Sequence, residues 1–90
     1  MKSATWAVPV DHPVFAGHFP SRPIVPGVVL LDRLLGFVAV PCDIANAKFL
    51  SPARPGEVLE FLWQGTPSGA IRFDISAAGR AVATGVLTSR

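Results

Sequence analysis

The chain has 90 residues, of which 50% are hydrophobic and 16% are charged, so its composition is that of one globular domain spanning residues 1–90. The formal net charge is +2, and no two of the eight basic residues are adjacent, which argues against a nucleic-acid-binding protein because such proteins cluster their charge. A chain of this length buries only roughly 60–65% of its unfolded surface, so we expect a homo-oligomer to cover the surplus apolar surface.

The first predicted element is a strand over residues 4–10, followed by an irregular loop. Apolar residues of the strand alternate with a period of two, namely Trp6, Val8 and Val10. Pro9 indicates an edge strand or the end of one, because proline cannot donate to a sheet hydrogen bond. Residues 11–26 contain four prolines, which exclude a helix or a central strand and predict an ordered loop.

A helix is predicted over residues 28–40, which are apolar on almost every side. Such a pattern is typical of a buried helix. Pro26 and Gly27 indicate where the helix starts, and Pro41 prevents its continuation. Gly36 destabilises a helix interior by around 1 kcal/mol relative to alanine, which indicates close packing against something.

Four strand-like segments follow, at residues 44–50, 57–64, 70–77 and 81–88. In the third of them Ile71, Phe73 and Ile75 alternate with polar residues, which predicts one buried face. The short turns between the later strands favour an antiparallel meander. We expect the single helix to lie across the apolar face of this sheet.

Asp32 lies in the middle of the apolar helix, where a carboxylate is costly unless it is paired or used in chemistry. Alternatively, Asp32 marks a solvent-facing side of the helix or pairs with another subunit. His18 lies upstream in the proline-stiffened loop, which loses little entropy on ordering. A structural hydrogen bond within the loop is the alternative role for this histidine.

The loop leads directly to the helix N-terminus, where free N–H groups near Gly27 and Val28 can polarise a carbonyl oxygen. His18 suits the role of a base near neutral pH. Asp32 suits the role of an acid, because apolar surroundings favour the neutral carboxyl group. Together these groups can remove a proton beside a carbonyl and help to expel a hydroxyl from the neighbouring carbon.

The stretch from Phe15 to Asp32, with its Gly17-His18-Phe19-Pro20 run, resembles the active-site segment of hotdog-fold 3-hydroxyacyl-acyl-carrier-protein dehydratases. The spacing of fourteen residues from His18 to Asp32 matches that family, and residues 48–57 resemble its next strand and turn. The resemblance implies an α+β hotdog fold, with a five-stranded antiparallel sheet wrapped around one central helix. It also implies at least a dimer with shared active sites, in which His18 of one chain faces Asp32 of the other.

The activity implied by the resemblance is dehydration of 3-hydroxyacyl thioesters, linked to acyl carrier protein or to coenzyme A, in fatty acid, polyene or related lipid biosynthesis. His18 would abstract the C2 proton, Asp32 would protonate the departing hydroxyl, and the Gly27 N–H would bind the thioester oxygen. The side chains of Phe19, Val28 and Leu31 are expected to form the walls of the acyl site. The alternative for each of these residues is a role in the protein core. No metal or organic cofactor is required.

The chain departs from the usual family pattern in two ways. Asp32 stands where most dehydratases of general chain elongation have glutamate, and aspartate resembles the branch that also isomerises the double bond. The chain is shorter than the usual member, and it resembles compact dehydratase-like proteins of specialised polyene or lipid pathways.

Three other interpretations remain open. The first two are a hotdog thioesterase and a non-catalytic acyl-binding subunit of the same fold. The third is a metal site formed by Asp11, His12, His18 and Asp32, which lacks a recognised metal-binding spacing.

The remaining features concern redox state and compartment. A single cysteine, Cys42, excludes an internal disulfide, and we expect it to be a small apolar residue of the interior. The first six residues lack the apolar core of a signal peptide. No apolar run approaches the ~18 residues of a membrane span. These features predict a cytoplasmic protein without a membrane span.

Overall fold

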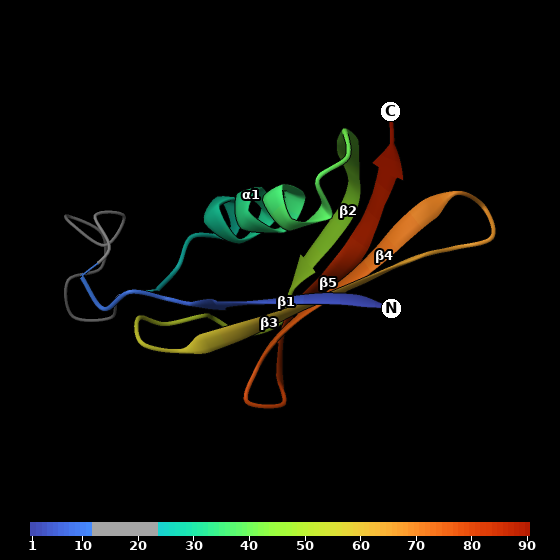
Figure 1. Cartoon of the computed structure of the whole chain (residues 1–90). Coiled ribbons are helices and arrows are strands. Elements are labelled where there is room, and N and C mark those ends of the chain that lie inside the picture. Colours follow the sequence, from blue (N-terminus) through green and yellow to red (C-terminus); the bar gives the residue numbers. More distant parts are fainter. Residues whose placement is uncertain (12–23) are drawn as a thin grey trace.

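A five-stranded antiparallel sheet curves around one helix in residues 1–11 and 24–90, the part of the chain described by this computed structural model (Figure 1). The elements in chain order are β1 (Lys2–Ala7), α1 (Gly27–Val38), β2 (Cys42–Phe49), β3 (Val58–Gly65), β4 (Ala70–Ala77) and β5 (Arg80–Ser89). The strand order across the sheet is β1-β3-β4-β5-β2. The predicted sheet wrapped around one helix is therefore confirmed.

The first strand lies earlier in the chain than the alternation indicated. β1 ends at Ala7 and pairs only with β3, so it is the edge strand that Pro9 predicts. Val8 is buried just beyond the strand, where its N–H and carbonyl group bond to the residues that precede β3. Val10, expected on the same apolar face, is 75% exposed, because the chain has left the sheet before reaching it.

The helix ends at Val38, two residues before the predicted end. Ala39 adopts the left-handed conformation, with φ 62°, and its N–H donates to the carbonyl oxygen of Leu35 at 3.1 Å. This arrangement caps the helix before Pro41 is reached. Among the described residues, no helix is both long and apolar enough to cross a membrane.

The expectation of a helix buried on every side is wrong for the single chain. Its buried residues are Leu30, Leu34 and Val38, which lie on the side that packs against the sheet. The opposite side is exposed and carries Val28, Asp32, Arg33 and Gly36. One sheet can cover only one side of a helix, so the apolar residues on the other side remain uncovered.

The predicted meander holds for β3, β4 and β5, which pair in sequence order. It is wrong for β2, which pairs with the far side of β5 and not with β3. In β4 the predicted alternation is confirmed, since Phe73 and Ile75 are buried while Arg72 and Asp74 are exposed. Cys42, at the start of β2, is buried as expected.

The core lies between α1 and the inner face of the sheet. Its largest fully buried side chains are Phe61, Phe73, Leu34, Leu59, Ile75, Leu87 and Val82. The half-buried ring of Phe37 meets Phe61 edge-on, with the centroids 5.1 Å apart, and lies parallel to Trp63 at 6.5 Å. These aromatic contacts fix the C-terminal half of α1 on β3.

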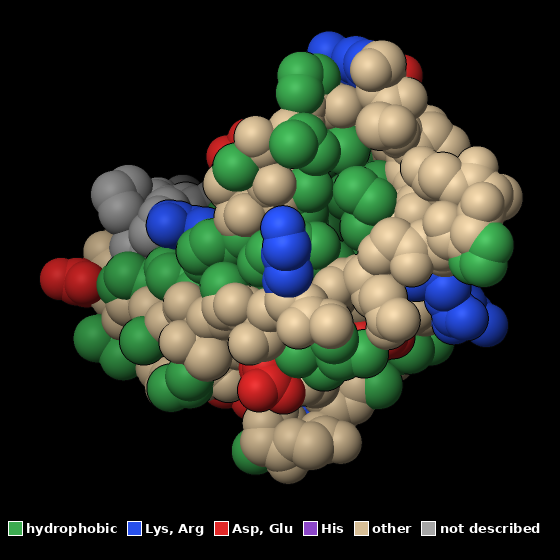
Figure 2. All heavy atoms as spheres, turned by 45° about the vertical axis from the view of Figure 1, so that its right-hand side comes forward, with side chains coloured by type: hydrophobic (Ala, Val, Ile, Leu, Met, Phe, Trp, Pro, Cys, Tyr) green, Lys and Arg blue, Asp and Glu red, His purple; other side chains and the backbone are tan. Residues whose placement is uncertain are grey.

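The inner face of the sheet continues past the helix at the β2 edge. Ile44 lies opposite Leu87, and Phe49 lies opposite Ala83, in the β2–β5 register. Both β5 residues are buried, yet Ile44 is 40% exposed and Phe49 is 51% exposed. Directly opposite residues share a face of the sheet, so apolar side chains of the core face are left uncovered here. Figure 2 shows hydrophobic side chains gathered around a hollow on one side of the molecule.

An arginine on β5 holds the connection between β2 and β3. Arg80 donates from Nη1 to Ser51 Oγ at 2.7 Å and to the Pro52 carbonyl oxygen at 2.8 Å, and from Nη2 to Glu57 Oε2. The Arg54 N–H donates to the other oxygen of Glu57 at 2.8 Å. Partial burial acts to raise the pKa of Glu57, but these hydrogen bonds and the two arginine charges outweigh it and hold that pKa below its usual 4.5.

Candidate active site

The predicted site residues divide between described and undescribed parts of the chain. Gly27, Val28, Leu31 and Asp32 lie on α1. His18 and Phe19 lie outside the described residues, as do His12 and most of the proline-rich loop. The geometry of the candidate site is therefore built from the helix and from the segments that contact it.

The N-terminus of α1 offers backbone donors. Pro26 is the N-cap residue, and it has no side-chain acceptor for the first helical N–H groups. Its carbonyl oxygen accepts from the N–H groups of Val29 at 3.0 Å and Leu30 at 3.4 Å. The N–H groups of Gly27 and Val28 make no hydrogen bond with another described residue. No acidic residue lies in the first turn, so the positive end of the helix dipole is free to stabilise a developing negative charge.

Phe49, at the end of β2, covers this first turn. A Cβ atom placed on Gly27 would lie 2.6 Å from Phe49 Cζ and 2.9 Å from Cε1. Distances this short mean that the Phe49 ring, which is 51% exposed, would have to move to admit a side chain at position 27. Phe49 lies within the 48–57 stretch that resembles the dehydratases, but no local pattern in the sequence marks it as a neighbour of Gly27.

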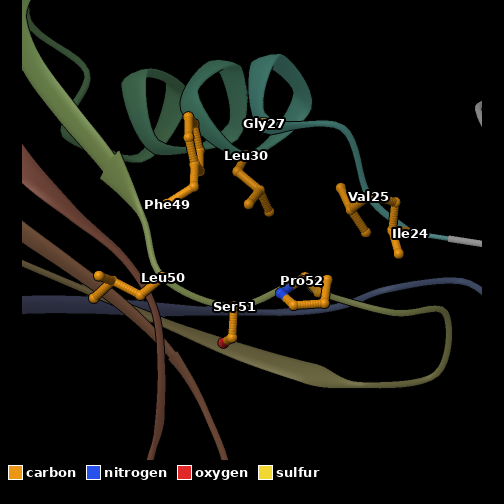
Figure 3. A pocket seen from close by; sticks show the side chains of 9 residues that line it. Ile24, Val25, Gly27, Leu30, Phe49, Leu50, Ser51 and Pro52 are labelled. Carbon is orange, nitrogen blue, oxygen red and sulfur yellow. The ribbon is translucent and has the colours of Figure 1, made fainter.

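A pocket of about 370 Å³ adjoins the same turn, between the start of α1 and the segment after β2 (Figure 3). In the close view Leu30 projects from the helix toward Ser51 and Pro52. Phe49 and Leu50 lie on one side of the pocket, and Ile24 and Val25 lie on the other. The pocket is mostly apolar and lies where the chain leaves the predicted catalytic loop.

Asp32 lies on the exposed side of α1, in a groove of about 700 Å³. We call this the α1 groove, and the described residues that line it all lie on α1, namely Val28, Val29, Asp32, Arg33, Gly36 and Phe37. Asp32 makes no hydrogen bond or ion pair with another described residue. The neighbouring Arg33 is turned onto the ring of Trp6, with its guanidinium carbon 4.3 Å from the ring centroid. Asp32 is thus exposed in the single chain, but in a groove with largely apolar walls.

The two predicted acyl-site walls on the helix differ in their surroundings. Val28 is 73% exposed and lines the α1 groove beside Asp32, one turn earlier on the same face. Leu31 is half-buried, packs against the core and does not line the groove. Contacts within the chain therefore favour the core role for Leu31 and leave Val28 available to a ligand.

The described residues bring together no group of three or more histidine, cysteine, aspartate or glutamate side chains able to hold a metal ion. What the helix does present is a pair of amide donors at its start and a carboxyl group five residues later. The rise of an α-helix places Gly27 and Asp32 about 7.5 Å apart along the axis.

The five-stranded antiparallel sheet wrapped around one helix defines a hotdog-fold domain. Residues 2–86 match the model of the ApeI-like family, whose description is ApeI dehydratase. The chain belongs to the ApeI-like dehydratase family.

Curated relatives include 3-hydroxyacyl-[acyl-carrier-protein] dehydratases named FabZ. The protein from Chlamydia trachomatis serovar L2 is 40% identical over 68 residues, which cover 58% of this chain and 44% of that one. The protein from a Roseiflexus species is 32% identical over 95 residues, which cover 90% of this chain and 61% of that one. The chain thus spans about half the length of the curated relatives that it matches.

Solved structures with the same fold include both dehydratases and a thioesterase. "The Dehydratase Heterocomplex ApeI:P from Xenorhabdus doucetiae" matches with a TM-score of 0.83 and 21% identity, covering 98% of this chain and 86% of that one. The fluoroacetyl-CoA-specific thioesterase FlK matches with a TM-score of 0.66 and 10% identity, covering 97% of this chain and 84% of that one. At these identities the likeness confirms the hotdog fold alone. The choice between dehydration and thioester hydrolysis depends on the residues of the site.

Proposed function

We propose that this protein is a hydro-lyase that converts 3-hydroxyacyl thioesters, linked to acyl carrier protein, into trans-2-enoyl thioesters in fatty acid, polyene or related lipid biosynthesis. The observation that carries the proposal is Asp32, an acid exposed in a largely apolar groove. It lies on a helix whose first two N–H groups make no hydrogen bond with a described residue, and this helix follows the Gly17-His18-Phe19-Pro20 run in the sequence. Membership of the ApeI-like dehydratase family supports the same chemistry.

The proposed reaction divides the elimination among three groups. The thioester oxygen accepts a hydrogen bond from the Gly27 N–H, which stabilises enolate character as it develops. His18 takes the proton from C2. Asp32 gives a proton to the hydroxyl on C3, directly or through water, so that the C3–O bond breaks and water leaves. Proton transfer from His18 back to Asp32, through solvent, restores the starting state.

The acyl chain would lie against apolar side chains beside this centre. Phe19, Val28 and Leu31 are the proposed walls. The exposure of Val28 in the α1 groove supports its assignment. Partial packing of Leu31 against the core leaves only part of that side chain to meet a substrate.

The active unit is proposed to be a homodimer with shared sites, in which His18 of one chain faces Asp32 of the other. Two features support a second copy as the partner. β2 is an edge strand, and no described strand pairs with its outer side; such edges in native proteins are normally covered. Ile44 and Phe49 belong to the core face of the sheet but remain exposed at that edge. Phe49 also lies next to the start of the helix that carries Asp32.

The test is hydration of a short trans-2-enoyl thioester, the reverse reaction, followed by loss of the enoyl-thioester absorbance. Wild type, His18→Ala and Asp32→Asn are compared, with Asp74→Asn as the control because Asp74 is exposed on β4, away from the groove. We expect hydration by wild type and the control and a loss of at least 100-fold in the two site variants. Unchanged activity in His18→Ala would remove His18 from the mechanism, and release of free thiol in place of hydration would identify a thioesterase.

A non-catalytic acyl-binding subunit is the second candidate, favoured by the similarity to a structure described as a dehydratase heterocomplex. Such a subunit would bind acyl thioesters without turnover when tested alone. Replacement of His18 would then leave the binding intact. Hydration by the purified chain, lost in His18→Ala, would contradict this candidate.

A further inference from the structure

The connection between β2 and β3, residues 50–57, is held in different ways at its ends and in its middle. At its start the N–H groups of residues 50 and 51 donate to the carbonyl oxygen of Val82, and at its end the backbone of residues 56 and 57 bonds to that of Val8. The middle contains two prolines, which have no N–H group to donate. It therefore depends more on side-chain partners than the ends do.

Arg80, at the start of β5, is the main partner of this middle part. One guanidinium group donates to Ser51 Oγ at 2.7 Å, to the Pro52 carbonyl oxygen at 2.8 Å and to Glu57 Oε2. The other oxygen of Glu57 accepts from the Arg54 N–H at 2.8 Å. The side chains of Arg80 and Glu57 are only 36% and 27% exposed, so water screens these charge-assisted bonds only in part. Arg80 thus fixes the connection on both sides of its centre.

The centre of the connection in turn holds the segment that leads into α1. The Val25 N–H donates to the Ala53 carbonyl oxygen at 2.7 Å, and both residues are buried. Within the described part of the chain, this is the only backbone hydrogen bond that joins residues 24–26 to anything other than α1. Figure 3 shows Val25 beside the start of the helix, with Pro52 across the pocket. A shift of the connection would therefore reach Gly27, two residues after Val25.

We propose that Arg80 is a positioning residue, which fixes the first amides of α1 through the β2–β3 connection and its bond to Val25. The inference rests on the proposed dehydratase function, in which the Gly27 N–H binds the thioester oxygen. Arg80 lines neither the pocket at this turn nor the α1 groove, so it acts through the connection and not on the substrate. Such an effect can be large, because misplacement of a reacting group by about 1 Å can cost about 100-fold in rate.

The experiment measures kcat and KM for hydration of a short trans-2-enoyl thioester in wild type, Arg80→Met and Arg80→Lys. Methionine keeps the aliphatic stem and removes the guanidinium group. We expect Arg80→Met to lower kcat at least tenfold and to change KM much less, because the misplaced amide stabilises charge that develops in the transition state. Arg80→Lys should lie between the two, since an ammonium group cannot match the planar guanidinium fork at three acceptors.

Arg90→Met is the matched control. Arg90 follows the other end of β5, and its Nε lies 2.8 Å from Oδ1 of Asp43 on β2. The control therefore removes another arginine–carboxylate pair between the same part of the sheet and β5, but far along the strand from the first turn of α1. We expect its kcat and KM to stay close to those of wild type.

Amide hydrogen exchange, followed by NMR, separates positioning from a general loss of stability. Exchange at the Val25 N–H should speed up in Arg80→Met at least tenfold more than exchange at Phe61 in β3, because local opening of the connection adds to global unfolding. Arg90→Met should show no such difference between the two amides. This readout does not depend on catalysis.

Three results would overturn the inference while leaving the proposed function in place. The first is a kcat close to that of wild type in Arg80→Met. The second is equal acceleration of exchange at Val25 and Phe61, which would show that Arg80 only stabilises the fold. The third is a changed oligomeric state of Arg80→Met in light scattering, since assembly would then explain the lost activity. Wild type that hydrates no enoyl thioester would overturn the proposed function, and the inference with it.

Discussion

The ring of Phe49 fills the space beside Gly27 that any side chain at position 27 would need. Ring atoms Cζ and Cε1 would lie 2.6 and 2.9 Å from an added Cβ atom. Distances below 3.0 Å require one of the two partners to move. The end of β2 and the first turn of α1 are thus fitted to each other at the amides proposed to bind the thioester oxygen.

Replacement of Gly27 by alanine should therefore destabilise the protein, although alanine is the better helix former. We expect Gly27→Ala to lower the free energy of unfolding by up to about 1 kcal/mol, measured by urea denaturation, because the cost of overpacking is reduced where a half-exposed ring such as that of Phe49 can turn away. Phe49→Leu in the same chain should recover part of that loss, because the smaller side chain leaves room for the methyl group. Equal losses with and without Phe49→Leu would contradict the contact.

Asp32 should matter for activity and not for stability. It is exposed and makes no hydrogen bond or ion pair with another described residue. We expect Asp32→Asn to reduce enoyl-thioester hydration by at least 100-fold, while the melting temperature changes by less than about 4 °C. Asp32→Glu should keep part of the activity, since it retains the acid and alters only its reach. A near-normal rate in Asp32→Asn would restore the interpretation of Asp32 as a solvent-facing residue.

The exposed apolar edge of β2 should control assembly. Ile44 shares the core face with Leu87 and is 40% exposed. We expect Ile44→Lys to shift a wild-type dimer toward monomer in size-exclusion chromatography with light scattering, because a buried unpaired charge is costly at an interface. Hydration activity should fall with the dimer fraction if the sites are shared.

Asn46→Lys provides the matched control for assembly, since it adds the same charge to an exposed position on the same strand. That variant should remain dimeric if the interface uses the core face. A wild-type chain that is monomeric at all concentrations would remove the shared-site proposal.

The ion pair of Glu57 with Arg80 should make stability depend on acid pH. The folded-state pKa of Glu57 lies below its usual 4.5, so the pair contributes stability above that value and loses it as the pH falls through the lower folded-state pKa. We expect Glu57→Gln to be less stable than wild type by about 1 kcal/mol at pH 7. The difference should shrink when urea denaturation is repeated at progressively lower pH below 4.5.

Glu60→Gln serves as the control for this pH dependence, because Glu60 is exposed on β3 and has no hydrogen-bond or ion-pair partner among the described residues. Its stability should follow that of wild type across the same pH range. A Glu57→Gln deficit that persists unchanged at low pH would point to lost packing and not to the ion pair.

The sequence by itself predicted the elements and the family. The alternation at Ile71, Phe73 and Ile75 and the prolines at residues 26 and 41 act locally, and local patterns report secondary structure directly. The run from Gly17 to Pro20, with Asp32 fourteen residues after His18, indicated the dehydratase family that the match over residues 2–86 confirms. The roles of His18 and Asp32 stay predictions.

Only the tertiary structure decided which apolar residues are covered and which strands are neighbours. Hydrophobicity around α1 predicted burial on all sides, but one sheet reaches only the side of Leu30 and Leu34. The position of β2 beside β5, and of Phe49 against Gly27, depends on pairing between segments distant in the chain. No local periodicity encodes such contacts, because they arise when the sheet curves around the helix and brings remote residues to one surface.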